Sequence, residues 1–407
     1  MHIQRCLKQA LLNATASFPV IMLTGPRQVG KTTLLQQIQQ PERQYVTLDN
    51  LEDRMLAKSD PAGFLQRYAP PVLIDEVQYA PELFPYIKIL ADKHKQPGMF
   101  WLTGSQQFEL MKNVTESMAG RVAILKLLGI SIDEEHSNPN VTAFIPEEPY
   151  LTSRMPVAPK LTLPKIYQKI WRGSFPFVVI NDTDANRELF YQSYISTYIQ
   201  RDIRNFMQIE NQDKFLRFMH VTAARSGQLI NYADFARDVG VSEPTIKTWI
   251  TILRASGLVY ILEPYYNNLI KRLVKTPKLY FLDTGLCCYL TGWPNARTLE
   301  LSAMSGAMLE TYVISEIIKT FLHKGKEPKL FFYRDKEQQE IDLIIEANGK
   351  IYPIEIKKTA TPGNINLKNL HMLNKIALPL GPASVICLRE THIPLATNIN
   401  AIPVGYI

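Results

Sequence analysis

One stretch of the chain combines residue types and spacing that suit phosphate binding. It reads GPRQVGKTT over residues 25–33 and directly follows a short apolar run, Val20 to Leu23. In a G-x-x-x-x-G-K-T loop the two glycines let successive backbone N–H groups point into one cavity, and the helix that begins near Lys31 adds its N-terminal dipole. The lysine faces the β- and γ-phosphates, and the Thr32 hydroxyl is placed to bind Mg²⁺. We therefore expect this stretch to bind ATP with Mg²⁺. The expected ATP-binding residues are Gly25, Pro26, Arg27, Gln28, Val29, Gly30, Lys31, Thr32 and Thr33.

A second stretch, PVLIDE at residues 71–76, is an apolar run that ends in two carboxylates. At the end of a buried strand, Asp75 would hold Mg²⁺ together with Thr32, and Glu76 would act as the general base that polarises the attacking water. Taken alone, the run also fits a strand that stops at a solvated acidic turn. Its combination with the phosphate-binding loop favours a Walker B motif, and therefore hydrolysis of ATP in addition to binding.

A third polar group completes the expected site. The apolar run Met99 to Thr103 is followed by Gly104 and Ser105. A polar residue at the end of the strand beside the Walker B strand is placed to sense the γ-phosphate, and we assign that role to Ser105 or Thr103. The expected catalytic residues are Lys31, Asp75, Glu76 and Ser105.

These residues require a parallel sheet to position them, and the chain of 407 residues is long enough for two or three domains. The net charge is +7, and the excess lies outside the first 160 residues, which is compatible with a DNA or RNA partner without requiring one. The four cysteines show neither a disulfide framework nor metal-ligand spacing, and no apolar run reaches the length of a membrane span. We expect a cytoplasmic protein with no membrane partner.

The middle of the chain contains a helix-turn-helix pattern. Apolar residues at helical spacing begin at Tyr232, Gly240 ends that helix, and Ser242 followed by Pro244 begins the next. A strand after Gly257 would lead into a wing. The exposed face of the second helix offers Lys247, Thr248, Thr251 and Arg254. Two basic residues are few for a DNA-reading helix, so the module either contacts DNA or has a structural or protein-contact role.

The C-terminal part contains a second constellation of charged residues. Asn348-Gly349 between two apolar-rich runs predicts a β-hairpin with a type I′ turn, and its register places Asp342 opposite Glu355, with Lys357 on the same face. Facing carboxylates repel one another, and a divalent cation (Mg²⁺ or Mn²⁺) between them would remove that repulsion. The other interpretation is a hairpin rim that exposes charged residues to water. On the opposite face we expect Ile341, Leu343, Ile345, Tyr352, Ile354 and Ile356 to form a core.

The motifs together resemble those of the uncharacterised bacterial and archaeal AAA-type ATPases that carry a C-terminal domain of unknown function. The segments that carry the resemblance are GPRQVGKTT, LDN, PVLIDEVQYAPELF, WLTGSQQF and SMAGRV, followed by YISTYIQRDIRNF, KTPKLYFLDTGL, GAMLETYVISEI and YPIEIKK. The resemblance covers nearly the whole chain. It implies a AAA+ ATPase with a winged-helix middle and a C-terminal domain similar to the PD-(D/E)xK nuclease core, in which Glu310 matches the upstream acidic residue. It implies no substrate.

We expect an α/β protein in which a P-loop NTPase (AAA+/ASCE) parallel sheet is followed by a helical winged-helix module and an α/β restriction-endonuclease-like domain. The expected boundaries are 1–131 for the ATPase domain, 132–164 for a Pro-rich linker, 165–304 for the helical module and 305–407 for the nuclease-like domain. Arg121 is either an arginine that reaches a phosphate in its own or a neighbouring subunit, which would imply a homo-oligomer, or a surface residue.

Two functions fit these features. The first is an ATP-hydrolysing protein that acts on nucleic acid and carries a metal-dependent nuclease-like site at Glu310, Asp342, Glu355 and Lys357. The second is a nucleotide-dependent switch or scaffold that binds a protein partner and cuts no strand.

Overall fold

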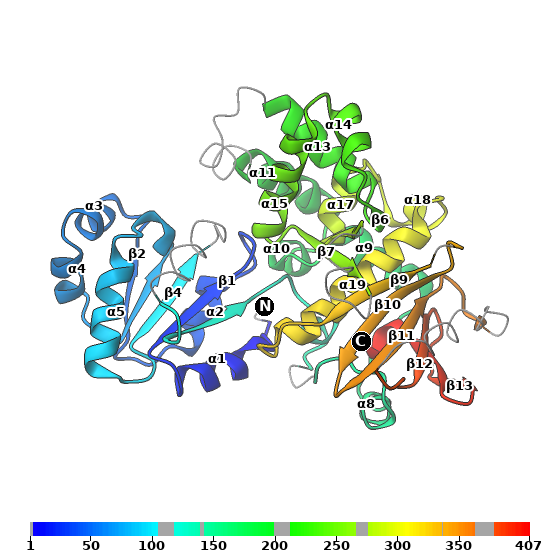
Figure 1. Cartoon of the computed structure of the whole chain (residues 1–407), viewed down its shortest axis with the longest axis horizontal. Helices are drawn as coiled ribbons and strands as arrows, with labels where there is room; N and C mark the ends of the chain where they lie inside the picture. The colour runs from blue at the N-terminus through cyan, green and yellow to red at the C-terminus, as the bar shows by residue number, and fades with distance from the viewer. Residues whose placement is uncertain are drawn as a thin grey trace.

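The computed structural model describes residues 3–104, 118–138, 142–198, 212–265, 276–335, 337–362 and 378–407. Within these ranges the chain forms one sheet of five strands and one of nine strands. In Figure 1 the five-stranded sheet and its helices lie on the left in blue and cyan, and a helical module lies at the top in green. The long helix α19 (Ser305–Leu322) runs through the middle, beside the orange and red strands of the nine-stranded sheet. Among the described residues, no helix combines the length and apolar character needed to span a membrane.

The five-stranded sheet is entirely parallel, with the strand order β2-β3-β4-β1-β5. Strands β1, β3 and β4 are buried along their whole length, because helices cover both faces of the sheet. The order places β4 between β1 and β3, so the carboxyl ends of these three strands meet at one edge. The strands are β1 (Val20–Thr24), β2 (Gln44–Thr47), β3 (Val72–Asp75), β4 (Phe100–Gly104) and β5 (Val122–Lys126). The covering helices are α1 (Leu7–Thr15), α2 (Lys31–Ile38), α3 (Leu51–Ser59), α4 (Pro61–Arg67), η1 (Val77–Tyr79) and α5 (Leu83–His94).

The helical module contains the helix-turn-helix that the sequence predicts. Gly240 ends α14 with φ at +78°, and the Ser242 side chain accepts a hydrogen bond from the Thr245 N–H at the start of α15. The helices are α9 (Leu163–Arg172), α10 (Pro176–Ile180), α11 (Asp184–Tyr198), α13 (Gln212–Ala224), α14 (Tyr232–Val239), α15 (Glu243–Ala255), α17 (Thr284–Leu290) and α18 (Ala296–Glu300). The strands are β6 (Gln228–Leu229), β7 (Val259–Pro264) and β8 (Lys278–Phe281).

The nine-stranded sheet joins the helical module to the C-terminal part of the chain. Its order is β13-β14-β12-β11-β10-β9-β7-β8-β6, and β7 pairs with β9 at Glu263 with Phe331 and at Pro264 with Phe332. The sheet is therefore continuous across residue 304, where we expected one domain to end and the next to begin. The remaining strands are β9 (Leu330–Arg334), β10 (Glu340–Ala347), β11 (Lys350–Ile356), β12 (Ala383–Cys387), β13 (Ile393–Ala396) and β14 (Ile399–Pro403), followed by the short helix η5 (Val404–Tyr406).

Residues 132–164, for which we expect a Pro-rich linker or loop, include two short helices. They contain α7 (Ile132–Glu135) and α8 (Glu148–Arg154). Arg154 is buried, forms an ion pair of 2.6 Å with Asp133, and donates through Nε to the Tyr406 carbonyl at 3.0 Å. Proline residues of this stretch lie at the start of helices, and its acidic residues form buried ion pairs. These contacts connect the ATPase domain to the end of the chain.

The helix α7 supplies a prediction about stability and pH. Glu135 lies 2.7 Å from both Lys169 Nζ and Arg172 Nη2 of α9. Burial alone would raise the pKa of Glu135, but the hydrogen bond from Arg172 and the charge of Lys169 outweigh it and lower the pKa to about 2. The pKa of Glu135 is lower in the folded state than in the unfolded state. The ion pairs of Glu135 therefore stabilise the fold above about pH 4.5, and this contribution is lost as the pH falls toward 2.

Glu135→Gln is therefore expected to reduce the free energy of unfolding at pH 7 by about 2–3 kcal/mol, because Lys169 loses its partner and Arg172 keeps only Asp182. The difference from wild type should shrink as the pH is lowered from 5 to 3. Urea denaturation at several pH values checks this, with Glu188→Gln on the exposed face of α11 as the control. A difference that is the same at all pH values would contradict the assignment.

Candidate functional site

The phosphate-binding loop connects β1 to α2 in the conformation that its glycines allow. Gly25, Gln28 and Gly30 have φ values of +144°, +60° and +89°. Gly30 is the N-cap of α2, so the first N–H groups of this helix face the loop. The loop opens into a cavity of about 550 Å³. The cavity is lined by Arg27, Gln28, Gly30, Lys31, Thr32, Thr33, Glu76 and Thr197.

Gly25 is required by close packing as well as by its backbone conformation. A Cβ at this position would lie 2.0 Å from the carbonyl oxygen of Leu127, which follows β5. Gly25→Ala is therefore expected to displace the loop and to weaken ATP binding at least tenfold, as measured by titration calorimetry. Gly120→Ala is the matched control, because Gly120 also has positive φ but no atom within 4 Å of the added Cβ. Equal affinity in the two variants would rule out the packing argument.

Lys31 is buried inside the loop. Its ammonium donates to the carbonyl oxygens of Gly25 at 2.9 Å and Pro26 at 2.7 Å. These carbonyls offset the cost of burying the charge, and they keep the ammonium on the inner side of the cavity, where the loop amides also lie.

Hydrogen bonds connect the end of β3 to the phosphate-binding loop and to β4. The Thr32 hydroxyl donates to Asp75 Oδ1 at 2.9 Å, and the Thr103 hydroxyl at the end of β4 donates to the same oxygen. Thr103 also accepts from the Glu76 N–H at 3.2 Å. The structure thus brings Thr32, Asp75 and Thr103 together, as the strand order requires. Ser105, the other residue expected to sense the γ-phosphate, lies outside the described residues.

Two residues of this site were not expected from the sequence. The Tyr45 hydroxyl donates to Asp75 Oδ2 at 3.3 Å, and burial together with the charge of Asp75 raises the pKa of Tyr45 to about 12. The Gln78 amide donates to Glu76 Oε2. Glu76 itself has φ of +57°, a strained conformation that turns it from the strand toward the cavity. Tyr45 could have been found as a polar residue on the strand next to β3, and Gln78 as an amide two residues after the carboxylate.

Arg121 is placed as a surface residue in this structure. Its guanidinium donates to Asp92 Oδ2 at 3.0 Å and to the Ala119 carbonyl at 2.8 Å, and the arginine and the aspartate are both partly exposed. Reaching a phosphate would require this pair to separate.

The C-terminal hairpin has the predicted turn and register. Asn348 and Gly349 have φ of +51° and +72°, as a type I′ turn requires, and β10 pairs with β11 from Ala347 with Lys350 to Leu343 with Ile354. One detail differs. The pairing of β10 with β9 shifts by one residue between Ile341 and Ile344, so Ile341 packs with Ile344 and not with Leu343 as expected. Such a bulge redirects side chains, and Asp342 lies in it.

The two facing carboxylates of this hairpin are buried, and a partly exposed lysine joins them. Asp342 and Glu355 are 9% and 6% exposed, so they do not form a solvated rim. Lys357 Nζ lies 3.2 Å from Asp342 Oδ2 and 2.7 Å from Glu355 Oε2. Burial alone would lower the pKa of Lys357, but these two negative charges outweigh it and raise the pKa. Lys357 therefore relieves the repulsion that we expected a divalent cation to relieve.

Glu310 lies next to this group but has partners of its own. It accepts from Tyr280 Oη at 2.5 Å and from Lys278 Nζ at 3.3 Å, and Lys278 also contacts Glu340. Burial, opposed by Lys278 and reinforced by the charge of Asp342, raises the pKa of Glu310. Lys278 comes from β8 of the helical module, and sequence spacing alone gave no signal for it.

One carboxylate oxygen of Glu355 stands out. Among the described residues, no donor forms a hydrogen bond with the buried Oε1 of Glu355, and burial together with the charge of Asp342 raises the pKa of Glu355 to about 7. Within the described ranges, no three His, Cys, Asp or Glu side chains converge in a way that would hold a metal ion. Asp342 and Glu355 could contribute ligands, but Glu310 does not complete a cluster with them in this conformation.

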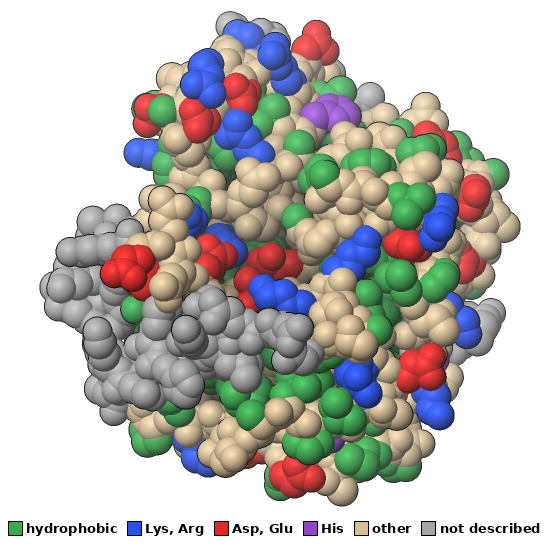
Figure 2. Space-filling view, turned by 90° about the vertical axis from the view of Figure 1, so that its right-hand side faces the viewer, with side chains coloured by type: hydrophobic (Ala, Val, Ile, Leu, Met, Phe, Trp, Pro, Cys, Tyr) green, Lys and Arg blue, Asp and Glu red, His purple; other side chains and the backbone are tan. Residues whose placement is uncertain are grey.

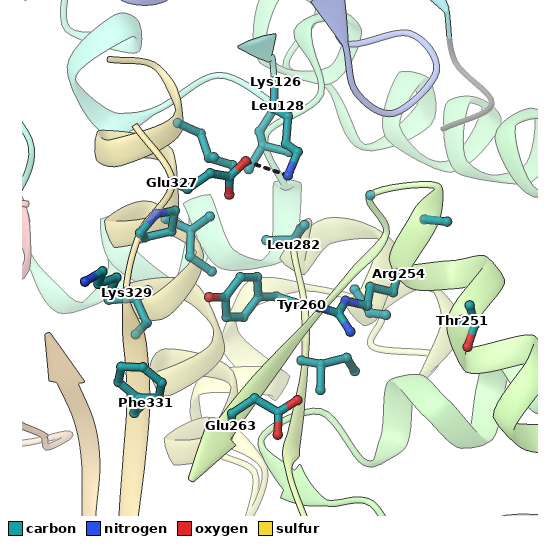
Figure 3. A pocket seen from close by; sticks show the side chains of 18 residues that line it. Lys126, Leu128, Thr251, Arg254, Tyr260, Glu263, Leu282, Glu327, Lys329 and Phe331 are labelled. Carbon is teal, nitrogen blue, oxygen red and sulfur yellow. Dashed lines mark ion pairs between the residues drawn. The ribbon is translucent and has the colours of Figure 1, made fainter. Parts of the chain in front are cut away.

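The exposed face of α15 opens into a cavity of about 640 Å³ (Figure 3). Arg254 of α15 and Tyr260 and Glu263 of β7 line it, and an ion pair of 2.7 Å between Lys126 and Glu327 joins the ATPase domain to the C-terminal part beside it. The hydroxyls of Thr248 and Thr251 donate to carbonyl oxygens of their own helix. Charges of both signs therefore surround this face, and Figure 2 likewise shows basic and acidic side chains interspersed on the coloured surface of the face it presents.

Three ranges of the chain match family models. Residues 17–136 match a model described as AAA domain. Residues 163–297 and 305–407 match two models, each described as a domain of unknown function (DUF8612 and DUF4143).

Similar proteins are found in bacteria and archaea. Uncharacterized protein Rv2008c of Mycobacterium tuberculosis is 29% identical over 408 residues, covering 98% of this chain and 82% of the relative. Uncharacterized protein MJ1637 of Methanocaldococcus jannaschii is 24% identical and covers 72% of this chain and 66% of the relative. Among solved structures, the Walker-type ATPase PABY2304 of Pyrococcus abyssi aligns at 12% identity with a TM-score of 0.39, covering 70% of this chain and 94% of that one. RuvB of Thermotoga maritima aligns at 18% identity with a TM-score of 0.27, covering 63% and 85%.

The family match and the geometry of the first site agree. The matched range contains the phosphate-binding loop, the carboxylates at the end of β3 and the parallel sheet that brings them together. The models that match the rest of the chain assign it no function. Residues 17–136 are therefore similar to an AAA domain both in sequence and in the placement of the phosphate-binding loop.

Proposed function

We propose that the protein binds and hydrolyses ATP at the carboxyl edge of the five-stranded sheet. The observation that carries this proposal is the convergence of Thr32, Asp75 and Thr103 beside a loop whose lysine and helix N-terminus face one cavity. A loop of this shape without carboxylates would support binding alone. With Glu76 in the cavity wall, the arrangement also supplies a base for hydrolysis.

Each residue has a task that its contacts support. The loop amides and Lys31 hold the phosphates, and Thr103 holds Asp75 and the backbone of Glu76 in register with the loop. Glu76 accepts a proton from the attacking water, and the Gln78 amide keeps its carboxylate oriented. Thr32 and Asp75 would hold Mg²⁺, which neutralises charge on the phosphates. The test is ATP turnover by the wild type against the Lys31→Ala and Glu76→Gln variants.

Glu355 Oε1, which is buried and has no hydrogen-bond donor in the described part of the chain, favours a second candidate function at the C-terminal hairpin. Asp342 and Glu355 would be ligands of Mg²⁺ or Mn²⁺, Lys357 would orient a water molecule, and the substrate would be a phosphodiester of DNA or RNA. The basic residues of α15 and a winged-helix arrangement of the module would then contact the nucleic acid. Cleavage of DNA and RNA by wild type and Asp342→Ala tests this function.

The lysine pairs favour the alternative, a nucleotide-dependent switch without cleavage. Lys357 and Lys278 already neutralise much of the acidic group, as they would in a structural network. In that case the helical module and the C-terminal domain bind a protein partner, and Asp342→Ala leaves every nucleic-acid assay unchanged. An arginine such as Arg121 that reaches a neighbouring nucleotide site would make the active form a homo-oligomer.

A further inference from the structure

A buried arginine from outside the phosphate-binding loop supports it from behind. Arg5 precedes α1 and is 6% exposed. Its Nη1 donates to the Val29 carbonyl at 2.7 Å, and its Nη2 donates to the carbonyls of Leu128 at 2.6 Å and Gly129 at 3.2 Å. A guanidinium holds several acceptors in a fixed geometry. Arg5 therefore fixes the loop, one residue before Gly30, against the segment that follows β5.

The charge of Arg5 is balanced by a glutamate that is itself fully buried. Glu134 Oε2 lies 3.1 Å from Arg5 Nε, and the carboxylate accepts the N–H groups of Cys6 at 2.7 Å and Ser131 at 3.0 Å. Burial alone would raise the pKa of Glu134, but Arg5 and His323 outweigh it and lower the pKa. A buried carboxylate of this kind depends on every partner it has.

The third member of this group comes from the C-terminal part of the chain. His323 follows α19, and its Nδ1 lies 3.3 Å from Glu134 Oε1. Its Nε2 accepts the Leu128 N–H at 3.3 Å, which places the ring proton on Nδ1, facing Glu134. One imidazole thus contacts both the partner of Arg5 and the residue whose carbonyl Arg5 holds.

The C-terminal half of α19 contacts the segment that follows β5. Four buried polar residues recur at helical spacing along its C-terminal half and the residue after it, and each contacts a residue of the segment that follows β5. The contacts are Glu316 with the Ile132 N–H at 2.9 Å, Lys319 with the Ile130 carbonyl at 3.0 Å, Thr320 with the Phe144 N–H at 3.0 Å, and His323 with Leu128 and Glu134. Glu310 lies on the same helix, about 20 Å from His323 at 1.5 Å per residue.

We propose that Arg5 is a positioning residue for the phosphate-binding loop. We further propose that the contact of Arg5 with the loop depends on the C-terminal domain, because His323 contacts Glu134, the partner of Arg5. The proposal rests on the proposed ATPase function, since it concerns the regulation of that site. Movement of α19 relative to residues 128–134 would separate His323 from Glu134 and leave Arg5 free to shift. By reciprocity, nucleotide bound at the loop would change the position of α19 and of Glu310.

The test compares Arg5 with Arg43, an equally buried arginine of the same domain. Arg43 donates to the Gly98 carbonyl at 2.8 Å at the amino edge of the sheet, opposite the loop. Arg5→Ala is expected to raise the KM for ATP roughly 10- to 100-fold, as for a lost hydrogen bond to a charged group. Arg43→Ala should lower the melting temperature and leave KM unchanged. If Arg5→Ala does not fold, Arg5→Lys keeps the charge beside Glu134 but cannot hold three carbonyls, and it should raise KM as well.

The role of the C-terminal domain is tested at His323. His323→Leu is expected to raise KM for ATP several-fold, and His323→Gln, whose amide can accept from Leu128 and donate to Glu134, should restore it. Unchanged KM in Arg5→Lys and His323→Leu, with normal turnover in the wild type, would overturn the inference and leave the ATPase function standing. A wild type that neither binds nor hydrolyses ATP would overturn the proposed function and the inference with it.

Discussion

Replacement of Lys31 by alanine is expected to abolish ATP turnover and to weaken ATP binding by about 10²-fold or more. The ammonium is buried in the loop and held by two carbonyls, and its loss removes the buried positive charge that faces the β- and γ-phosphates. Titration calorimetry with ATP and Mg²⁺ gives the affinity, and phosphate release gives the turnover. Lys169→Ala is the control, because Lys169 is also largely buried but pairs with Glu135 and does not line the cavity.

The Glu76→Gln variant separates binding from chemistry. It keeps the shape of the side chain and its place in the cavity wall, so ATP affinity should stay within a few-fold of wild type. The turnover number should fall by 10²- to 10⁴-fold, because an amide cannot accept the proton of the attacking water. A variant with wild-type turnover would show that Glu76 is not the base, and unaffected turnover in both variants would remove the ATPase assignment.

The sequence predicted those parts of the structure in which a local pattern determines the geometry. Gly25 and Gly30 determine the path of the loop, and Asn348-Gly349 determines the hairpin turn and, through it, the register of β10 and β11. The strand order of the parallel sheet follows from packing of helices on both faces and cannot be read from any single strand. The sequence offered Thr103 or Ser105 for the place beside Asp75, and the fold shows the hydrogen bond from Thr103.

The features that the sequence did not predict depend on long-range contacts. The bulge at Asp342 arises where β10 pairs with β9, and it moves Ile341 to the other core. The composition of residues 132–164 is typical of a linker. Their charged residues nevertheless have partners that are distant in sequence, as Arg154 has in the Tyr406 carbonyl. Lys278 contacts Glu310 from a different part of the chain for the same reason. Buried ion pairs leave no periodic signal in a sequence.

The second large effect is expected at Asp342. If the C-terminal hairpin is catalytic, wild type will cut plasmid, single-stranded DNA or RNA in the presence of Mg²⁺ or Mn²⁺, and Asp342→Ala will lose at least 10²-fold of that rate. The reaction should be run with and without ATP. Glu346→Gln is the matched control, since Glu346 lies on the same strand and pairs with Lys329 away from the group. Cleavage that survives in Asp342→Ala would point to a contaminating nuclease.

The stability of the Asp342→Ala variant distinguishes a structural network from a metal site. Lys357 is held between Asp342 and Glu355, and removing Asp342 leaves it paired with Glu355 alone. If the group is a structural network, Asp342→Ala will lower the free energy of unfolding by about 3–5 kcal/mol, as for a broken buried pair, while wild type cuts nothing. If the group is a metal site, Mn²⁺ will raise the melting temperature of wild type and not of the variant. Wild type that neither cleaves nor responds to Mn²⁺ would make the hairpin a rigid part of the switch, because two lysines already supply the charge that a cation would bring.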